Sequence, residues 1–113
     1  MVTNLDFLTQ FTKGDNAKIK KYIEMYLDTA KQKMEVMKTA LQTKEYETLK
    51  VAAHTMKSQA RYMGITTMEA DIVSLEHTCT EQNNLDQLPM LVEKVNHILS
   101  QSITELSEKI NSL

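Results

Sequence analysis

Hydrophobic residues recur at steps of three or four along four stretches of the chain. In the first two stretches they are Ile19, Ile23, Tyr26, Ala30, Met34, Met37 and Leu41, followed by Leu49, Ala53, Met56, Ala60 and Met63. In the last two they are Met68, Ile72, Leu75 and Cys79, followed by Leu88, Leu91, Val95, Ile98, Ser102, Leu106 and Ile110, where Ser102 is the one polar interruption. This spacing places each set on one face of an α-helix and suits helices that pack at a shallow angle. The pattern therefore predicts four amphipathic helices.

The residues between these stretches predict where the helices end and begin. Gly14 is expected to end a short first helix near residues 5–12, and Asp15 to cap the long helix that follows. Thr43 is the candidate cap of the next helix. Gly64 is expected to end that helix in the left-handed conformation, which glycine adopts at little cost.

The second half of the chain carries similar signals. Thr66 and, three residues later, Glu69 have the spacing of a capping box at the start of a fourth helix. The pair Asn83-Asn84 predicts a loop. Asp86 is then expected to cap the last helix, with Pro89 in its first turn, where the N–H that proline lacks has no helical partner in any case.

The helices and their short connections predict an all-α fold. Only two glycines and one proline occur in 113 residues, so tight hairpin turns are scarce. The expected architecture is an up-and-down antiparallel four-helix bundle with a short extra N-terminal helix. That helix is expected to cover one end of the bundle through Leu5, Leu8 and Phe11. The length suits a single domain, residues 1–113, and no internal repeat or linker interrupts it.

Charge and cysteine content narrow the function classes. A net charge of −2 argues against general binding of nucleic acid, which rests on a strongly basic surface. No apolar run approaches the ~20 residues that cross a bilayer, and the N-terminus lacks a signal-peptide pattern, so no direct membrane contact is expected. A single cysteine, Cys79, excludes an internal disulfide and suits a reducing compartment. We therefore expect the cytoplasm.

One histidine has neighbours that point to chemistry. His54 faces away from the apolar stripe of the third predicted helix, on the same side as Lys50, Lys57, Ser58 and Arg61. A neutral imidazole is a nucleophile, and its attack on a phosphoryl group gives a phosphoramidate of high transfer potential. Nearby cations favour the negative phosphoryl group, although each exposed pair contributes only about 0–1 kcal/mol. The arrangement indicates a phosphate carrier.

The surrounding residues resemble the signature of histidine-containing phosphotransfer (HPt) domains over residues 22–76. The matching features are the run Ala53-His54-Thr55-Met56-Lys57, the small Ser58 after it, Gly64 seven residues beyond the lysine, and the later pair Leu75-Glu76. The resemblance implies that His54 accepts phosphate from a receiver-domain aspartate and passes it to another receiver. It also implies that Lys57 assists the phosphate and that Gly64 ends the helix.

Two residues depart from the family's usual pattern. Ser58 stands where glycine is usual directly after the lysine, and Gln59 stands where a small residue is common. Ser58 is still small, so access to the histidine is expected to persist. These two departures are expected to change the rate of phosphoryl transfer or the choice of partner.

The resemblance also implies partners. Receiver domains of response regulators, or of a hybrid sensor histidine kinase, are expected to contact Lys50, Ser58, Gln59 and Arg61. The chain is then a monomeric phosphocarrier and not an enzyme, since no glycine-rich loop for ATP occurs in it. We expect no cofactor, with Mg²⁺ held by the receiver alone. The chain would be a free cytoplasmic protein or the cytoplasmic domain of a membrane-bound sensor kinase.

Other residues with chemical potential have simpler explanations. His77 and His97 lie off the apolar stripes and are interpreted as surface residues, and Cys79 as a small core residue. Because neither HExxH nor paired cysteines occur, we expect no metal site. Met25 and Val36, beside the stripe of the second helix, are candidates for a docking patch.

Two functions from other classes stay open. A non-covalent helical adaptor would bind receivers or a kinase with His54 incidental, and a purely structural bundle would dimerise a larger signalling protein. The cations around His54 have no role in a dimerising bundle, so the sequence favours the relay.

Overall fold

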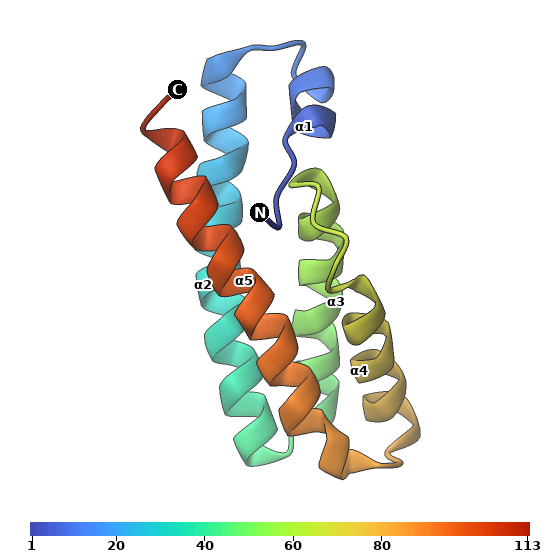
Figure 1. Cartoon of the computed structure of the whole chain (residues 1–113). Coiled ribbons are helices and arrows are strands. Elements are labelled where there is room, and N and C mark those ends of the chain that lie inside the picture. The colour runs from blue at the N-terminus through green and yellow to red at the C-terminus, as the bar shows by residue number, and fades with distance from the viewer.

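The chain folds into α-helices without any strand (Figure 1), and the computed structural model describes all of residues 1–113. The helices are α1 (Asp6–Phe11), α2 (Asn16–Thr43), α3 (Tyr46–Tyr62), α4 (Glu69–Glu81) and α5 (Leu88–Ile110), with a 3₁₀ turn, η1 (Leu85–Gln87), before the last. The predicted all-α fold class is confirmed.

Helices α2 to α5 form an antiparallel bundle in which each packs against two neighbours. Both α2 and α4 contact α3 and α5, so α2 and α4 occupy opposite corners of the bundle. The molecule measures 45 × 21 × 20 Å. Helices α3 and α4 are shorter than α2 and α5, and α1 lies beyond the end of α3 (Figure 1). The predicted four-helix bundle with a short extra N-terminal helix is confirmed.

Three of the predicted helix boundaries agree with the structure. Gly14 (φ +75°) and Gly64 (φ +68°) both adopt the left-handed conformation after a helix. Asp15 caps α2, because its Oδ1 accepts hydrogen bonds from the backbone N–H of Ala17 at 3.0 Å and of Lys18 at 3.2 Å. These bonds satisfy two of the N–H groups that a helix N-terminus leaves without partners.

The prediction that Thr43 caps α3 is wrong. Thr43 is the last residue of α2, and its hydroxyl donates to the carbonyl of Thr39 at 3.0 Å. Lys44 then ends the helix with φ +58°, and α3 begins after Glu45 without a side-chain cap. A threonine hydroxyl bonds as readily to the carbonyl four residues before it as to an N–H group after it, so its sequence position alone does not separate the two.

The two predicted caps in the second half are also wrong. Thr66 and Glu69 form no capping box, because α4 begins at Glu69 and the carboxylate of Glu69 binds Arg61 instead. Asp86 lies inside the 3₁₀ turn and makes no cap, since α5 starts directly from that turn. The position of Pro89 in the first turn of α5 is confirmed.

The predicted apolar stripes form the core, with differences on the two long helices. All predicted positions of α3 and α4 are buried, including Cys79. On α2 and α5, Met34, Leu41, Ile98 and Ile110 are only partly buried, while Leu27, Ala40, Val92 and Leu99 are buried in addition. Long helices that each contact two neighbours bury a face wider than a single stripe.

The polar interruption of α5 is a buried hydrogen-bonded pair. Ser102 is fully buried and its hydroxyl donates to the carbonyl of Leu99 at 2.7 Å. The hydroxyl of Tyr26, also fully buried, therefore donates to Ser102 Oγ at 2.7 Å. Burial raises the pKa of Tyr26 to about 12, against the opposing effect of the Ser102 hydrogen bond.

We expect Tyr26 to limit stability at high pH. The unfolded tyrosine ionises near its ordinary pKa of about 10, whereas the folded one holds its proton to about 12. The unfolded state therefore binds fewer protons between these values, and this group lowers the free energy of unfolding by about 1.4 kcal/mol per pH unit there. Urea denaturation of wild type and Tyr26→Phe at several pH values above 9 gives the free energy of unfolding of each as a function of pH. The free energy of wild type is expected to fall more steeply with pH than that of Tyr26→Phe, and an equal fall in both would contradict the prediction.

The segment before α1 is fixed to two elements of the bundle. The carboxylate of Glu105 on α5 accepts hydrogen bonds from the backbone N–H of Val2 at 2.9 Å and of Thr3 at 3.0 Å. The N–H of Asn4 donates to the carbonyl of Met63, at the end of α3, at 2.9 Å. These bonds place α1 next to the C-terminal end of α3.

Helix α1 covers the bundle differently from the prediction. Leu8 is fully buried and Leu5 is partly buried, but Phe11 is 53% exposed. A helix of six residues has room for little more than one inward position per turn, so Phe11 lies against other surface aromatic rings. Phe11 therefore helps to cover this end only as a half-exposed ring.

Candidate functional site

His54 is an exposed residue in the middle of α3. Its neighbours Ala52, Ala53 and Met56 are buried and fix that face of α3 against the core, so the histidine side chain points outward and is 60% exposed. The prediction that it lies off the apolar stripe is confirmed. His77 and His97 are exposed as well, but no hydrogen bond or ion pair joins either to another side chain.

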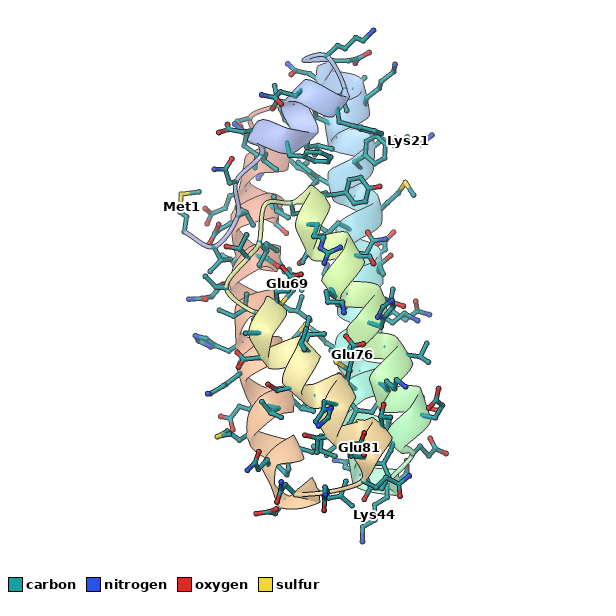
Figure 2. The ribbon with its side chains drawn as sticks, turned by 90° about the vertical axis from the view of Figure 1, so that its right-hand side faces the viewer. Met1, Lys21, Lys44, Glu69, Glu76 and Glu81 are labelled. Carbon is teal, nitrogen blue, oxygen red and sulfur yellow. The ribbon has the colours of Figure 1, made fainter.

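The carboxylate of Glu76 on α4 joins His54 to Lys57. One oxygen, Oε2, lies 3.2 Å from His54 Nδ1, and the other, Oε1, lies 2.9 Å from Lys57 Nζ. The side chains of Glu76 and Lys57 are each only 17% exposed, and this ion pair joins α3 to α4 (Figure 2, where Glu76 is labelled). The lysine and the histidine are thus held by the same acid.

Glu76 is a carboxylate at neutral pH. Burial alone would raise its pKa, but the hydrogen bonds and positive charges of Lys57 and His54 outweigh burial and hold the pKa of Glu76 below its usual value. An ionised carboxylate only accepts hydrogen bonds, so Nδ1 of His54 is the nitrogen that carries the proton in the neutral ring. Its other nitrogen, Nε2, then keeps its lone pair free for attack on an electrophile.

The other predicted site residues make no hydrogen bond or ion pair with His54. Arg61 forms an exposed ion pair with Glu69 of α4 at 2.6 Å. Ser58 is exposed, and Lys50 and Gln59 are partly buried, without hydrogen bonds or ion pairs from their side chains. The structure therefore brings His54 and Lys57 together and leaves the four predicted partner-binding residues available at the surface.

An exposed aromatic cluster next to this site was not predicted. Phe7 and Phe11 of α1 pack against Tyr62 of α3, with ring centroids 5.7 Å and 6.1 Å from it, and Phe11 also packs on Tyr22 of α2 at 5.7 Å. Phe7, Phe11 and Tyr62 are between 41% and 53% exposed, and Met25 beside them is 55% exposed. We call Phe7, Phe11, Tyr22, Met25 and Tyr62 the aromatic patch.

The aromatic patch adjoins the face of His54. Tyr62 follows His54 by eight residues on α3, which corresponds to about 12 Å along the helix axis. Ser58, between them, lines a surface hollow of about 510 Å³ together with Phe7, Arg61 and Tyr62. A protein that covers His54 along α3 in this direction would also cover the patch.

The role of Glu76 was missed by sequence reasoning, apart from the place of Leu75-Glu76 in the resemblance. The only local signal was an acid beside a buried leucine on α4, and an acid there is usually solvated. No three or more His, Cys, Asp or Glu side chains gather anywhere as a set that could hold a metal ion.

Comparison with known families and structures decides the assignment. The family model described as Hpt domain matches residues 21–109 of the 113. The chain belongs to the Hpt domain family. As an Hpt domain it has a histidine phosphotransfer role in a two-component phosphorelay, and receiver domains are the partners of such domains. Phosphocarrier is thus the class of protein to which it belongs.

A solved structure shows the same fold. The crystal structure of histidine-containing phosphotransfer protein B (HptB) from Pseudomonas aeruginosa PAO1 matches this Hpt domain with a TM-score of 0.86 and 14% sequence identity, over 99% of this chain and 96% of that one. At this identity the likeness establishes the fold alone. No curated protein matches the sequence. None of the helices of this Hpt domain combines the length and apolarity of a membrane span.

Proposed function

We propose that His54 is the phosphoacceptor of this Hpt domain and that Nε2 is its reacting atom. The observation that supports this most directly is the contact of Nδ1 with the carboxylate of Glu76, which leaves Nε2 as the nitrogen with a free lone pair on an exposed ring. A docked receiver brings its phospho-aspartate in line with Nε2. The N–P bond forms while the P–O bond to the aspartate breaks, and the electron pair returns to the aspartate carboxylate.

Lys57 assists the phosphate by charge. Its ammonium group lies 2.9 Å from Glu76 and offsets the negative charge of that acid, which would otherwise repel an incoming phosphoryl group. Phosphoryl transfer needs positioning and charge compensation more than covalent participation by the protein. In this proposal the receiver supplies Mg²⁺, and the chain holds no cofactor and binds no ATP.

The remaining predicted residues contact the partner. Lys50, Ser58 and Arg61 share the face of α3 that carries His54, and Gln59 lies on the flank next to the aromatic patch. Arg61 offers a charge at the surface even while paired with Glu69. We propose that residues 1–113 act as one monomeric domain in the cytoplasm. Each receiver must dissociate after transfer, which suits an interface near or below about 1,200 Å².

The aromatic patch is the apolar part of this receiver-docking surface. Truncation of Phe11 by Phe11→Ala is expected to slow transfer from a phosphorylated receiver about tenfold, because an aromatic side chain at the centre of an interface contributes more than about 1 kcal/mol. Labelling of His54 by phosphoramidate, a small donor that needs no docking, is expected to stay at the wild-type rate. The matched control is Met90→Ala, at a methionine that is 50% exposed on α5, away from α3. Equal slowing by both variants would contradict a docking role for the patch.

The test of the function is phosphoryl transfer from a panel of phosphorylated receiver domains of the same source. The relay predicts that acid-labile, alkali-stable phosphate appears on this chain after it is mixed with its phosphorylated donor. The non-covalent adaptor predicts receiver binding without phosphate on this chain. Absence of label from every competent donor, with the chain folded and bound to a receiver, would favour the adaptor.

A further inference from the structure

We propose that Glu76 keeps the Nδ1 proton on the His54 ring throughout the transfer cycle, so that the phosphorylated carrier is a phosphoimidazolium. The inference rests on the proposed function of His54 and adds a second role for this acid. In the free protein the carboxylate fixes which nitrogen attacks. In the phosphorylated protein it would determine how readily the phosphate leaves.

The geometry supports a fixed position for the carboxylate. Glu76 is mostly buried between α3 and α4, and its Oε1 is occupied by Lys57 at 2.9 Å. Its Oε2 remains for the ring at 3.2 Å from Nδ1. Phosphorylation at Nε2 takes place on the opposite edge of the ring and leaves this contact in place.

The chemistry balances without a proton leaving or entering the ring. When the lone pair of Nε2 forms the N–P bond, the ring becomes positively charged and still carries the Nδ1 proton. That proton is either lost to water or retained by a hydrogen bond to a nearby anion, and a carboxylate in contact with Nδ1 favours retention. In onward transfer an aspartate oxygen forms the new P–O bond, the N–P bond breaks, and its electron pair returns to Nε2.

Retention of the proton keeps the phosphate transferable. If Nδ1 stays protonated, the group that leaves the phosphorus is a neutral imidazole. If Nδ1 loses its proton, the leaving group is an imidazolate anion, which is a far stronger base and leaves correspondingly slowly. Glu76 would therefore keep the carrier reactive at a pH where a phosphohistidine without a neighbouring acid is partly deprotonated.

No other charged group near the His54 ring favours retention of the Nδ1 proton as directly as Glu76 does. Charged and titratable residues of this part of the bundle include Glu47, Lys50, Lys57 and Arg61 on α3, Glu69, Glu76, His77 and Glu81 on α4, and Lys33 on α2, which lies beside Glu47. The cations disfavour a proton on the ring. Among the acids, only Glu76 has an atom in hydrogen-bond contact with it. Retention of the proton is thus assigned to Glu76 alone.

The experiment follows Nδ1 in the phosphorylated protein by ¹⁵N NMR. Wild type and Glu76→Gln are phosphorylated with phosphoramidate, and the ring-nitrogen shifts are recorded as pH is raised. The midpoint of Nδ1 deprotonation is expected to lie about one pH unit lower in Glu76→Gln than in wild type. The matched control Glu69→Gln removes a negative charge two turns earlier on the same helix, from an acid that pairs with Arg61, and is expected to keep the wild-type midpoint.

Onward transfer supplies a second readout that a merely structural role would not move. Over a rise from about pH 6 to pH 8, transfer to an unphosphorylated receiver is expected to fall about tenfold more in Glu76→Gln than in wild type. Glu76→Gln could fail to fold because Lys57 loses its partner. In that case the single variant Lys57→Met is compared with the double variant Lys57→Met/Glu76→Gln. The double variant is expected to show the same lowering of the midpoint of Nδ1 deprotonation.

The outcomes separate this inference from the proposed function. Equal midpoints in a variant and its reference, with His54 phosphorylated in both, would overturn the role of Glu76 and leave His54 as the acceptor. If neither phosphoramidate nor any receiver places phosphate on His54, the proposed function fails and the inference fails with it. A lower midpoint in Glu76→Gln and an unchanged one in Glu69→Gln would establish the inference.

Discussion

Replacement of His54 by glutamine is expected to abolish phosphate uptake by this Hpt domain, with labelling reduced at least about a thousandfold. The amide nitrogen of a glutamine side chain has no nucleophilic lone pair, so neither a receiver nor phosphoramidate forms a stable bond to it. The structure should survive His54→Gln, because the side chain is 60% exposed and its one polar partner is Glu76. We expect the free energy of unfolding to change by less than about 1 kcal/mol. The measurement is acid-labile, alkali-stable phosphate on the purified chain.

The matched control for this prediction is His77→Gln. His77 is an exposed histidine on the neighbouring helix α4, without a hydrogen bond or ion pair, so this variant removes an imidazole without disturbing Glu76. It is expected to accept phosphate at the wild-type rate. Label that persists in His54→Gln and disappears in His77→Gln would move the acceptor to α4 and contradict the proposed site.

The helices were predictable because burial imposes a strong and local pattern. Each of the stripes on α3 and α4 was predicted correctly, since every third or fourth residue of a helix that packs along its length must be apolar. Helix ends were less predictable. Asp15 caps α2 as expected, whereas Thr43, Thr66 and Asp86 do not cap their helices. Short polar side chains have several partners within reach, and the tertiary structure determines which one they bind.

The histidine and the lysine of the site were predictable, but the link between them was not. His54 and Lys57 are three residues apart on one helix, so their common face follows from helix geometry. The contact of each with Glu76 depends on the rotation and spacing of α4 against α3. Hydrophobic periodicity says which face of α4 is inward, but not which residue of α3 an acid at its edge will meet.

The aromatic patch was missed for a related reason. Phe11 was expected to cover one end of the bundle together with Leu5 and Leu8, yet it is 53% exposed. Apolar residues are common on protein surfaces, so the type of side chain decides burial only when a longer pattern supports it. A helix as short as α1 has no such pattern, and its rings were located only by the hydrogen bonds that place the N-terminal segment against α3 and α5.

Replacement of Gly64 by alanine is expected to cost more stability than any exposed substitution in the molecule. Gly64 has φ +68°, and a Cβ there would overlap the backbone carbonyl oxygen of Asn4 and stand 2.8 Å from the Cβ of Asn4. Asn4 cannot simply move away, because its N–H donates to the carbonyl of Met63 at 2.9 Å. Left-handed strain and steric overlap act together, so we expect Gly64→Ala to lower the free energy of unfolding by about 2–4 kcal/mol.

Gly14→Ala separates the two contributions of Gly64. Gly14 also has a positive φ, +75°, but no atom lies within 4 Å of the position of a Cβ there. This variant therefore carries the conformational strain alone, about 1 kcal/mol. Urea denaturation measures the free energy of unfolding of both variants. The dependence of that free energy on urea concentration is compared with wild type, because an unchanged dependence is what two-state unfolding of the same fold predicts. If Gly64→Ala lost no more stability than Gly14→Ala, the N-terminal segment would be able to shift freely. Its contact with the end of α3 would then not be what holds α1 and its aromatic rings against Tyr62.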